Sequence, residues 1–432
     1  MARILSASDA GFAETYRQLI ASRGARLDAA EKAAREIVDR VRAEGLPAVL
    51  DYTAKFENMR DLTAETMRVS PGEIERAYAA CAPELIDAMK SAAARIEAFH
   101  ARERPQHGEF VDQAGVTLGW RWTPIDSAGL YAPGGLAAYP STVLMNAIPA
   151  KAAGVKRLAM ATPAARALDN PAILAAAKIA GVDEIWMMGG AQAIAALAYG
   201  AGPIEACDVV VGPGNAYVAA AKKIVFGDVG IDAIAGPSEV FILCDGSVDP
   251  KWIAADLLAQ AEHDEDAQSV LFVTDRSYAE AVAAAVEEQL AQGKAGFPAR
   301  ESWDRHGAII LVAALEDAAP YVNLAAPEHV QIATKNPEPL AALIRHAGAL
   351  FLGAYAPEAL GDYVAGPSHV LPTNRAARYS AGVSAYTFMK RTSVIAADAR
   401  AVAAIGPAAA LLADCEGLPA HALSVRLRLP QG

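Results

Sequence analysis

Cysteine is scarce in this sequence, and its positions argue against two common ways of stabilising a domain. Four cysteines occur in 432 residues, at Cys81, Cys207, Cys244 and Cys415. None of them forms a C-x-x-C pair or a ladder of cysteine and histidine ligands. Neither a disulfide framework nor a structural zinc finger is therefore predicted. We expect buried, unreactive thiols.

Basic residues and long apolar runs are also few. The 38 lysines and arginines are outnumbered by 50 acidic residues, which gives a net charge of -12. Because nucleic-acid binding depends on clustered basic side chains, no nucleic-acid partner is expected. No run of about 18 uncharged apolar residues occurs, and Met1–Ile20 lacks the pattern of a secretion signal. We expect a cytoplasmic protein with no membrane partner.

What the chain does contain is length and an alanine-rich apolar content. Its 432 residues exceed one ordinary core, and 53% of them are hydrophobic while 20% are charged. This composition predicts two or more helix-rich globular domains. The spacing of Ala30, Ile37 and Val41 predicts a helix over 28–43. A capping box at Ser70 and further apolar spacing predict helices through the first hundred residues.

Strand and helix patterns alternate over the rest of the chain. Short apolar runs separated by helical stretches are typical of parallel sheets with crossover helices, so two doubly wound α/β units are predicted. The expected strands are 128–131, 157–161, 184–188 and 208–211 in one unit, and 239–244, 269–274, 308–312, 330–333 and 349–352 in the other. Trp120 and Trp122 lie on another alternating strand and are predicted to be core residues. The Gly- and Pro-rich segment 353–378 predicts an active-site loop or a domain boundary.

Three glycine-rich turns follow predicted strands of the first unit and place Tyr131, Gln192 and Asn215 beside them. Ligands of parallel sheets gather beyond the carboxyl ends of strands, and glycine lets backbone N–H groups approach a phosphate. These three residues are therefore candidates for binding a nucleotide. None of the turns has the G-x-G-x-x-G spacing, so ordinary strand-to-helix turns are an open alternative.

A candidate metal site involves Gln260 and His263, which lie three residues apart near the end of a predicted helix, and Asp362 from a loop. Side chains at that spacing share one face of a helix. A mixed set of nitrogen and oxygen ligands suits zinc or another divalent ion. The alternative is a solvated helix end, in which His263 is a cation that faces the helix dipole.

A candidate acid/base pair consists of the adjacent residues Glu328 and His329. A neutral histidine can accept a proton from an alcohol, and a carboxylate can activate water. Neighbours on an extended segment point to opposite sides, so a pair at a surface strand entry is the alternative. Ser238 is either a turn residue or a hydrogen-bond partner of a substrate.

Several long segments resemble the histidinol dehydrogenase family, and the likeness extends over almost the whole chain. The most specific segments are 139–151, 231–239, 256–264 and 369–373. Members of that family oxidise L-histidinol to L-histidine in two NAD-dependent steps through a bound aldehyde, and they are zinc-dependent homodimers. The resemblance implies two Rossmann-like doubly wound α/β domains that lack the G-x-G-x-x-G fingerprint, with small N- and C-terminal helical extensions.

The resemblance also implies roles for individual residues. One zinc ion per subunit would be bound by Gln260, His263, Asp362 and His421. His329 would be the general acid/base, and Glu328 would activate the water that hydrates the aldehyde. NAD would be contacted by Tyr131, Gln192 and Asn215. The substrate would be held by Ser238, Gln260, His263, His329, Asp362, Glu416 and His421. Glu416 and His421 would act in the active site of the partner subunit, so that the homodimer has shared sites.

The chain is expected to divide into four parts. They are 1–25 as an N-terminal helical extension, 26–129 with 238–380 as a discontinuous α/β domain for zinc, substrate and catalysis, 130–237 as an NAD-binding α/β domain, and 381–432 as a C-terminal dimerisation extension. One departure from the family pattern is Leu136, an apolar residue where relatives more often have a polar one. Because Leu136 lies near the expected NAD-binding turn, this departure bears on the affinity for NAD.

Two alternatives to a histidinol dehydrogenase are open. One is a related zinc- and NAD-dependent dehydrogenase of another small polar primary alcohol, such as a sulfonated diol. The other is a zinc-binding interaction module without turnover, against which the presence of both Glu328 and His329 argues. Neither Cys207 nor Cys244 lies in a catalytic motif, so a covalent intermediate on cysteine is the less favoured mechanism.

Overall fold

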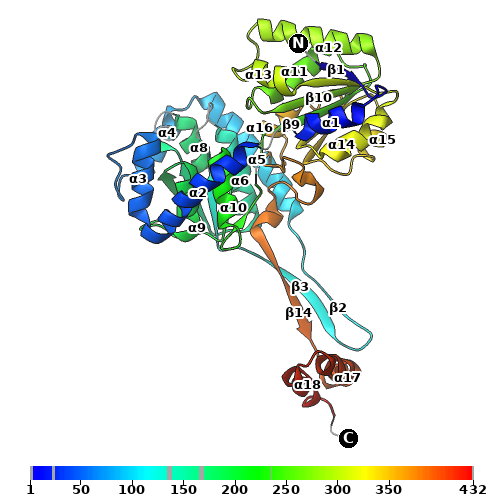
Figure 1. Cartoon of the computed structure of the whole chain (residues 1–432). Helices are drawn as coiled ribbons and strands as arrows, with labels where there is room; N and C mark the ends of the chain where they lie inside the picture. The colour runs from blue at the N-terminus through cyan, green and yellow to red at the C-terminus, as the bar shows by residue number, and fades with distance from the viewer. Residues whose placement is uncertain (1–2, 22–24, 134–138, 165–169, 235, 431–432) are drawn as a thin grey trace.

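The computed structural model describes the chain except for residues 1–2, 22–24, 134–138, 165–169, 235 and 431–432. It consists of two α/β domains and a long arm that extends away from them (Figure 1). Each domain contains a parallel sheet with helices on both faces, so the predicted fold class is confirmed. Within the described ranges, no helix is long and apolar enough to cross a membrane.

The larger sheet of the described chain has six parallel strands in the order β1-β11-β10-β9-β12-β13. The strands are β1 (Arg3–Ser6), β9 (Glu239–Cys244), β10 (Gln268–Val273), β11 (Ala308–Leu311), β12 (His329–Ala333) and β13 (Ala349–Leu352). β9, β10 and β12 are buried along their whole length because helices cover both faces.

The two faces of this sheet have separate cores. On one face, Phe241 and Phe272 pack against Phe12 and Tyr16 of the first helix. The elements on this face are α1 (Phe12–Ala21), η1 (Leu315–Ala318), α14 (Ala319–Ala325) and α15 (Glu338–Ala341). The other face is covered by α11 (Pro250–Ala261), α12 (Arg276–Ala291) and α13 (Ala299–His306).

The smaller sheet has five parallel strands among the described residues, in the order β6-β5-β4-β7-β8. The strands are β4 (Ser127–Tyr131), β5 (Arg157–Thr162), β6 (Glu184–Met187), β7 (Val209–Val211) and β8 (Gly230–Ile231). One face packs against α4 (Pro71–Ala80), α5 (Pro83–Glu103), α6 (Pro140–Ala153) and α8 (Pro171–Ala180). The other packs against α2 (Ala25–Glu44), α3 (Leu46–Glu57), α9 (Gly190–Tyr199) and α10 (Ala216–Val225).

The arm is an antiparallel ribbon that carries two helices at its far end (Figure 1). It contains β2 (Gly108–Val111), β3 (Thr117–Pro124) and β14 (Met389–Ala396), and it ends in α17 (Ala399–Cys415) and α18 (Pro419–Arg426). Among the described residues no helix layer covers its β2–β3 part (Figure 1), and Trp120 is 40% exposed. The prediction that Trp120 is a core residue is therefore wrong.

The structure corrects three boundaries of the predicted division. Residues 3–21 are part of the larger domain, because β1 pairs with β11 and α1 buries its apolar face in that domain's core. The helical part of 26–129, α2 to α5, belongs with the smaller domain because it covers that domain's sheet, whereas β2 and β3 belong to the arm. Val383 and Phe388 are also buried in the smaller domain's core, so the C-terminal extension begins at β14 rather than at residue 381.

Candidate active site between the two sheets

The amino ends of the six-stranded sheet face the carboxyl ends of the five-stranded sheet. The segment 232–238 leads directly from the end of β8 to the start of β9. The hydroxyl oxygen of Thr142, in the first turn of α6, lies 3.3 Å from Nε2 of His369. The N–H of Gly236 donates to the Thr373 hydroxyl at 2.6 Å. The beginning of α6 is therefore in contact with the loop that contains His369, whose Nδ1 atom lies 2.9 Å from the Asp362 carbonyl oxygen.

His329 is the first residue of β12, and its side chain is almost completely buried. Its Nδ1 atom lies 3.1 Å from the Glu239 carbonyl oxygen, 3.1 Å from Gln260 Oε1 and 3.2 Å from Glu358 Oε1. The Glu239 carbonyl oxygen can only accept, so the proton of the neutral ring belongs on Nδ1, and Nε2 is the atom that can accept another proton. Burial lowers the pKa of His329 to about 4, although the charge of Asp362 opposes this effect. The ring is neutral at physiological pH.

Glu328 and Glu239 form a reciprocal pair at the starts of β12 and β9. The Glu328 N–H donates to Glu239 Oε2 at 3.1 Å, and the Glu239 N–H donates to Glu328 Oε2 at 3.2 Å. Burial, and then the charge of Glu239, raise the pKa of Glu328 to about 8, while a hydrogen bond with Ser238 acts in the opposite direction. Glu328 is thus a carboxyl group that can exchange a proton near neutral pH.

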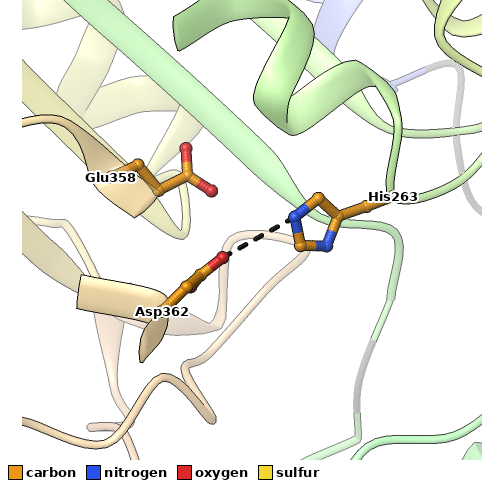
Figure 2. Close-up of side chains that lie close together, drawn as sticks. All are labelled: His263, Glu358 and Asp362. Atoms are coloured by element: carbon orange, nitrogen blue, oxygen red, sulfur yellow. Dashed lines mark ion pairs between the residues drawn. The ribbon is translucent and has the colours of Figure 1, made fainter. Parts of the chain in front are cut away.

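His263, Glu358 and Asp362 form a cluster whose possible ligand atoms all lie within 4.8 Å of one another. Figure 2 shows the three side chains pointing toward one another, and His263 Nε2 lies 3.6 Å from Asp362 Oδ2. His263 follows the end of α11, whereas the two acids share a face of α16 (Glu358–Tyr363). Part of the segment 353–378, predicted as a loop or a boundary, is therefore helical.

Glu358 is the most deeply buried member of this cluster. Its side chain is 1% exposed, and neither carboxyl oxygen has a hydrogen-bond partner. Burial raises the pKa of Glu358 well above its ordinary value, and the charges of Asp362 and Glu328 raise it further. Such a group is costly to leave unpaired, so the arrangement favours a cation at this position.

Gln260 lies beside the cluster, near the end of α11, and is fully buried. Its Oε1 atom lies near His329, while its Nε2 atom has no hydrogen-bond partner. Gln260 is thus joined to the cluster through His329, whose Nδ1 atom also lies 3.2 Å from Glu358 Oε1.

Tyr131, Gln192 and Asn215 lie at the carboxyl edge of the other sheet. The Tyr131 hydroxyl accepts from the Gly190 N–H at 3.0 Å, and burial raises the pKa of Tyr131 to about 12. Gln192 is 1% exposed, and its Oε1 atom has no partner. Asn215 Oδ1 accepts from two backbone N–H groups at the start of α10.

The backbone amides beside these residues are already bonded within the chain. Glu57 Oε1 accepts from the Gly189 N–H at 2.6 Å, next to the Tyr131 bond at the start of α9. These four amides, of Gly189, Gly190, Tyr217 and Val218, are therefore already occupied within the chain.

Glu416 and His421 are not brought to the cluster by their own chain. Both lie on the two-helix end of the arm, where they are exposed and line a hollow with Leu412, Leu418 and Val425. That end of the arm is far from both sheets (Figure 1). The fourth predicted metal ligand is therefore separated from the other three.

Known proteins resemble this chain over almost its whole length. A sequence model of the histidinol dehydrogenase family matches residues 21–429. The histidinol dehydrogenase of Caulobacter vibrioides is 52% identical over 425 residues, which cover 98% of each chain. The chain belongs to the histidinol dehydrogenase family.

Other relatives support the same assignment. The histidinol dehydrogenase of Rhodospirillum rubrum is 53% identical over 429 residues, or 99% of each chain. A crystal structure of histidinol dehydrogenase from Elizabethkingia anophelis has a TM-score of 0.90 at 35% identity, and the match covers 99% of this chain and 98% of that one. The resemblance found in the sequence is confirmed, and with it the class of oxidoreductases.

Sequence reasoning missed several residues of this site. Glu358 had one available signal, because it lies four residues before Asp362 and would share its face if that segment were a helix. Glu239 and His369 lie inside segments that resemble the histidinol dehydrogenase family, but no spacing marks their side chains as buried at the site. Leu136, the departure that concerns cofactor affinity, lies outside the described residues.

Proposed function

We propose that this chain oxidises L-histidinol to L-histidine in two NAD-dependent steps through a bound aldehyde, with one zinc ion per subunit. The observation that supports this most is the position of His329, buried between Glu328 and the cluster of His263, Glu358 and Asp362. A proton acceptor and a candidate metal site thus lie within one side chain's length of each other. Family membership supports the choice of substrate.

The residues present fit a zinc ion. His263, Asp362 and Gln260 supply the mixed nitrogen and oxygen set that zinc accepts, and the unpaired oxygens of Glu358 face the same space. A cation there would offset the clustered negative charge. When bound, zinc would supply a template that orients the polar end of the substrate. His421 of a second subunit is our candidate for the remaining ligand.

His329 is proposed as the group that takes up the alcohol proton. Its Nδ1 atom lies beside the Glu239 carbonyl oxygen and Gln260 Oε1, which holds the ring in one orientation and leaves Nε2 as the nitrogen that can accept a proton. The lowered pKa keeps the ring neutral and able to accept a proton. NAD, when bound, would supply the hydride acceptor for both oxidations, and the side chains proposed to contact it are Tyr131, Gln192 and Asn215.

Glu328 is proposed to activate the water that hydrates the aldehyde. Its carboxyl group is buried beside Ser238, and its raised pKa makes the ionised form a stronger base than an exposed glutamate. Separate bases would thus serve alcohol oxidation and aldehyde hydration. Ser238 is proposed to hydrogen-bond the substrate.

The site is proposed to be completed by a second copy of the chain. Glu416 and His421 are exposed at the end of an arm that extends away from its own sheets. An arm of this shape can reach another subunit, and a symmetric homodimer would then have two shared sites. A cytoplasmic setting is also proposed, which the four unpaired thiols support.

The test is to count the NADH formed per L-histidinol consumed by purified protein, with chelated and zinc-restored controls. We expect about two NADH per substrate and histidine as the product, lost on chelation and regained with zinc. No turnover of histidinol by zinc-loaded, folded protein would contradict the proposal and favour the dehydrogenase of another polar alcohol. Absence of any NAD-dependent oxidation of polar alcohols would favour the interaction module.

A further inference from the structure

A buried ion pair lies in the smaller domain, away from the catalytic cluster. Lys222 is on α10, and Asp232 directly follows β8. Their side chains are 2% and 4% exposed, and the ammonium group contacts the carboxylate. Neither residue has been given a role in the proposed reaction.

Together these two side chains hold both polar backbone groups of a single residue. Lys222 Nζ donates to the carbonyl oxygen of Gly212 at 3.0 Å, and the Gly212 N–H donates to Asp232 Oδ2 at 2.8 Å. Gly212 is thus fixed from two directions, by a helix and by the end of the neighbouring strand. We refer to Lys222, Asp232 and Gly212 as the turn clamp.

Gly212 occupies a position that fixes the shape of the carboxyl edge. Its φ of +116° suits glycine, and a Cβ atom there would lie 2.2 Å from the carbonyl oxygen of Tyr131. It also begins the turn Gly212-Pro213-Gly214-Asn215 that leads into α10. The turn clamp therefore lies between two of the residues proposed to contact NAD, Tyr131 and Asn215.

Stability alone does not account for such a pair. Removing two charges from water costs about as much as their attraction returns, so a buried ion pair is a weak source of folding free energy. What this pair does provide is a fixed direction for the backbone at the start of the turn. Asn215 Oδ1 fixes the other end through the first amides of α10, which leaves the amide nitrogen of Asn215 for a ligand.

We propose that Lys222 and Asp232 are positioning residues for the dinucleotide: they hold Gly212 so that Tyr131 and Asn215 keep the spacing that NAD requires. This inference rests on the proposed NAD-dependent function. The pair acts through the turn and does not touch the reacting atoms. It should therefore affect the affinity for the dinucleotide and leave the chemistry at the other sheet unchanged.

The test uses two variants of the full-length, zinc-loaded protein. Lys222→Met leaves Asp232 buried without a partner and can fail to fold, so the informative variant is Lys222→Met/Asp232→Asn, which removes both charges and keeps an acceptor for the Gly212 N–H. For the double variant we expect the Kd for NADH and the KM for NAD to rise about tenfold. We expect the kcat at saturating NAD, the KM for histidinol and the zinc content to stay close to wild type.

A matched control is available at the next residue. Lys223 is also on α10 but pairs with Glu31 at the surface, 2.7 Å away. Lys223→Met removes the same side-chain type without disturbing Gly212, so its NADH affinity should equal that of the wild type. A similar loss of affinity in Lys223→Met would overturn the proposal, because it would assign the effect to general charge on α10.

The readouts separate failure of this inference from failure of the proposed function. NADH affinity is measured by fluorescence titration and does not need turnover. If the wild-type protein and a folded double variant bind NADH equally well, the proposed role of the turn clamp is overturned and the proposed function is unaffected. A parallel fall in kcat and in the affinities for NAD and histidinol would also overturn it, since that pattern indicates a general structural role. If the wild-type protein binds NADH but does not oxidise histidinol, and the double variant binds NADH more weakly, only the proposed function is contradicted.

Discussion

The residues proposed for binding and catalysis lie at opposite ends of the two sheets. In the five-stranded sheet, Tyr131 and Asn215 lie at the carboxyl ends of the strands, where ligands of parallel sheets are expected. In the six-stranded sheet, Glu239 and His329 are the first residues of their strands. The same architecture thus provides two different edges to the proposed site.

Helix dipoles give this difference a physical meaning. The amino edge of a parallel sheet is where crossover helices end, and α11 ends there beside His263 with the partial negative charge of its last carbonyls. That edge favours a cation. The carboxyl edge is where helices begin, so it favours negative charge, as the Glu57 carboxylate at the start of α9 illustrates. The amino edge thus suits the proposed metal, whereas the carboxyl edge already has an anion of its own at the start of α9.

The sharpest test of the comparison is His329→Asn, which removes the proposed base from the amino edge. We expect turnover to fall about a thousandfold, because a positioned base contributes on this scale. Zinc content should be retained, since His329 is not among the proposed zinc ligands. The measurements are kcat with histidinol and bound zinc by mass spectrometry, and His346→Asn in the same domain is the control. If zinc content falls in parallel with activity, His329 is a metal ligand rather than only a base.

A second test asks whether the amino edge is completed by another subunit. His421→Ala and Glu328→Ala should each be nearly inactive, but a hybrid dimer would contain one intact site. Random mixing should restore about a quarter of wild-type activity, because half of the dimers are hybrids with one working site of two. If hybrids are shown to form and activity never returns, His421 acts within its own subunit or not at all.

Much of this arrangement could be predicted from the sequence, because strands and helices have local signals. The apolar runs at 239–244 and 308–312 mark buried strands, and Gln260 and His263 share a helix end by spacing alone. What could not be predicted is which sheet an amphipathic helix covers. The pattern of Ala30, Ile37 and Val41 shows that one face of α2 is apolar, but any apolar sheet face would satisfy it.

The buried acids show a second limit. Glu358 follows a proline in a segment rich in turn residues, and nothing local distinguishes it from a solvated glutamate. Its burial results from the packing of α16 against residues far away in the sequence. Similarly, the four residues of β1 are too few to show a period, so their pairing with β11 has no sequence signal.

A third test separates the two bases at the amino edge by pH. Glu328 must lose its proton to activate water, and burial raises its pKa to about 8. The rate of aldehyde oxidation should therefore fall about tenfold for each pH unit below about 8. The rate of alcohol oxidation, which uses His329, should not show this decrease. Single-turnover pH profiles of the two steps measure this. An aldehyde step that stays flat through that range would assign water activation to another group.

The smallest expected effect concerns the carboxyl edge. Asn215→Ala removes the cap of α10 and a proposed NAD contact, so we expect a loss of about 1 kcal/mol in the free energy of unfolding and a severalfold rise in the KM for NAD. Asn170→Ala, which removes the similar cap of α8, should lower stability without changing this KM. Thermal unfolding and NAD kinetics check both. If the KM for NAD is the same in Asn215→Ala and Asn170→Ala, Asn215 does not contact NAD.

The pairing of β3 with β14 has a consequence for synthesis of the protein. Pro124 pairs with Met389, so β3 leaves the ribosome long before its partner strand is made. At about 5–20 residues per second, the delay is roughly 15 to 50 s. Throughout that time one edge of the β2–β3 hairpin is open to pairing with other chains. The arm is therefore where we expect nascent chains to need protection from aggregation.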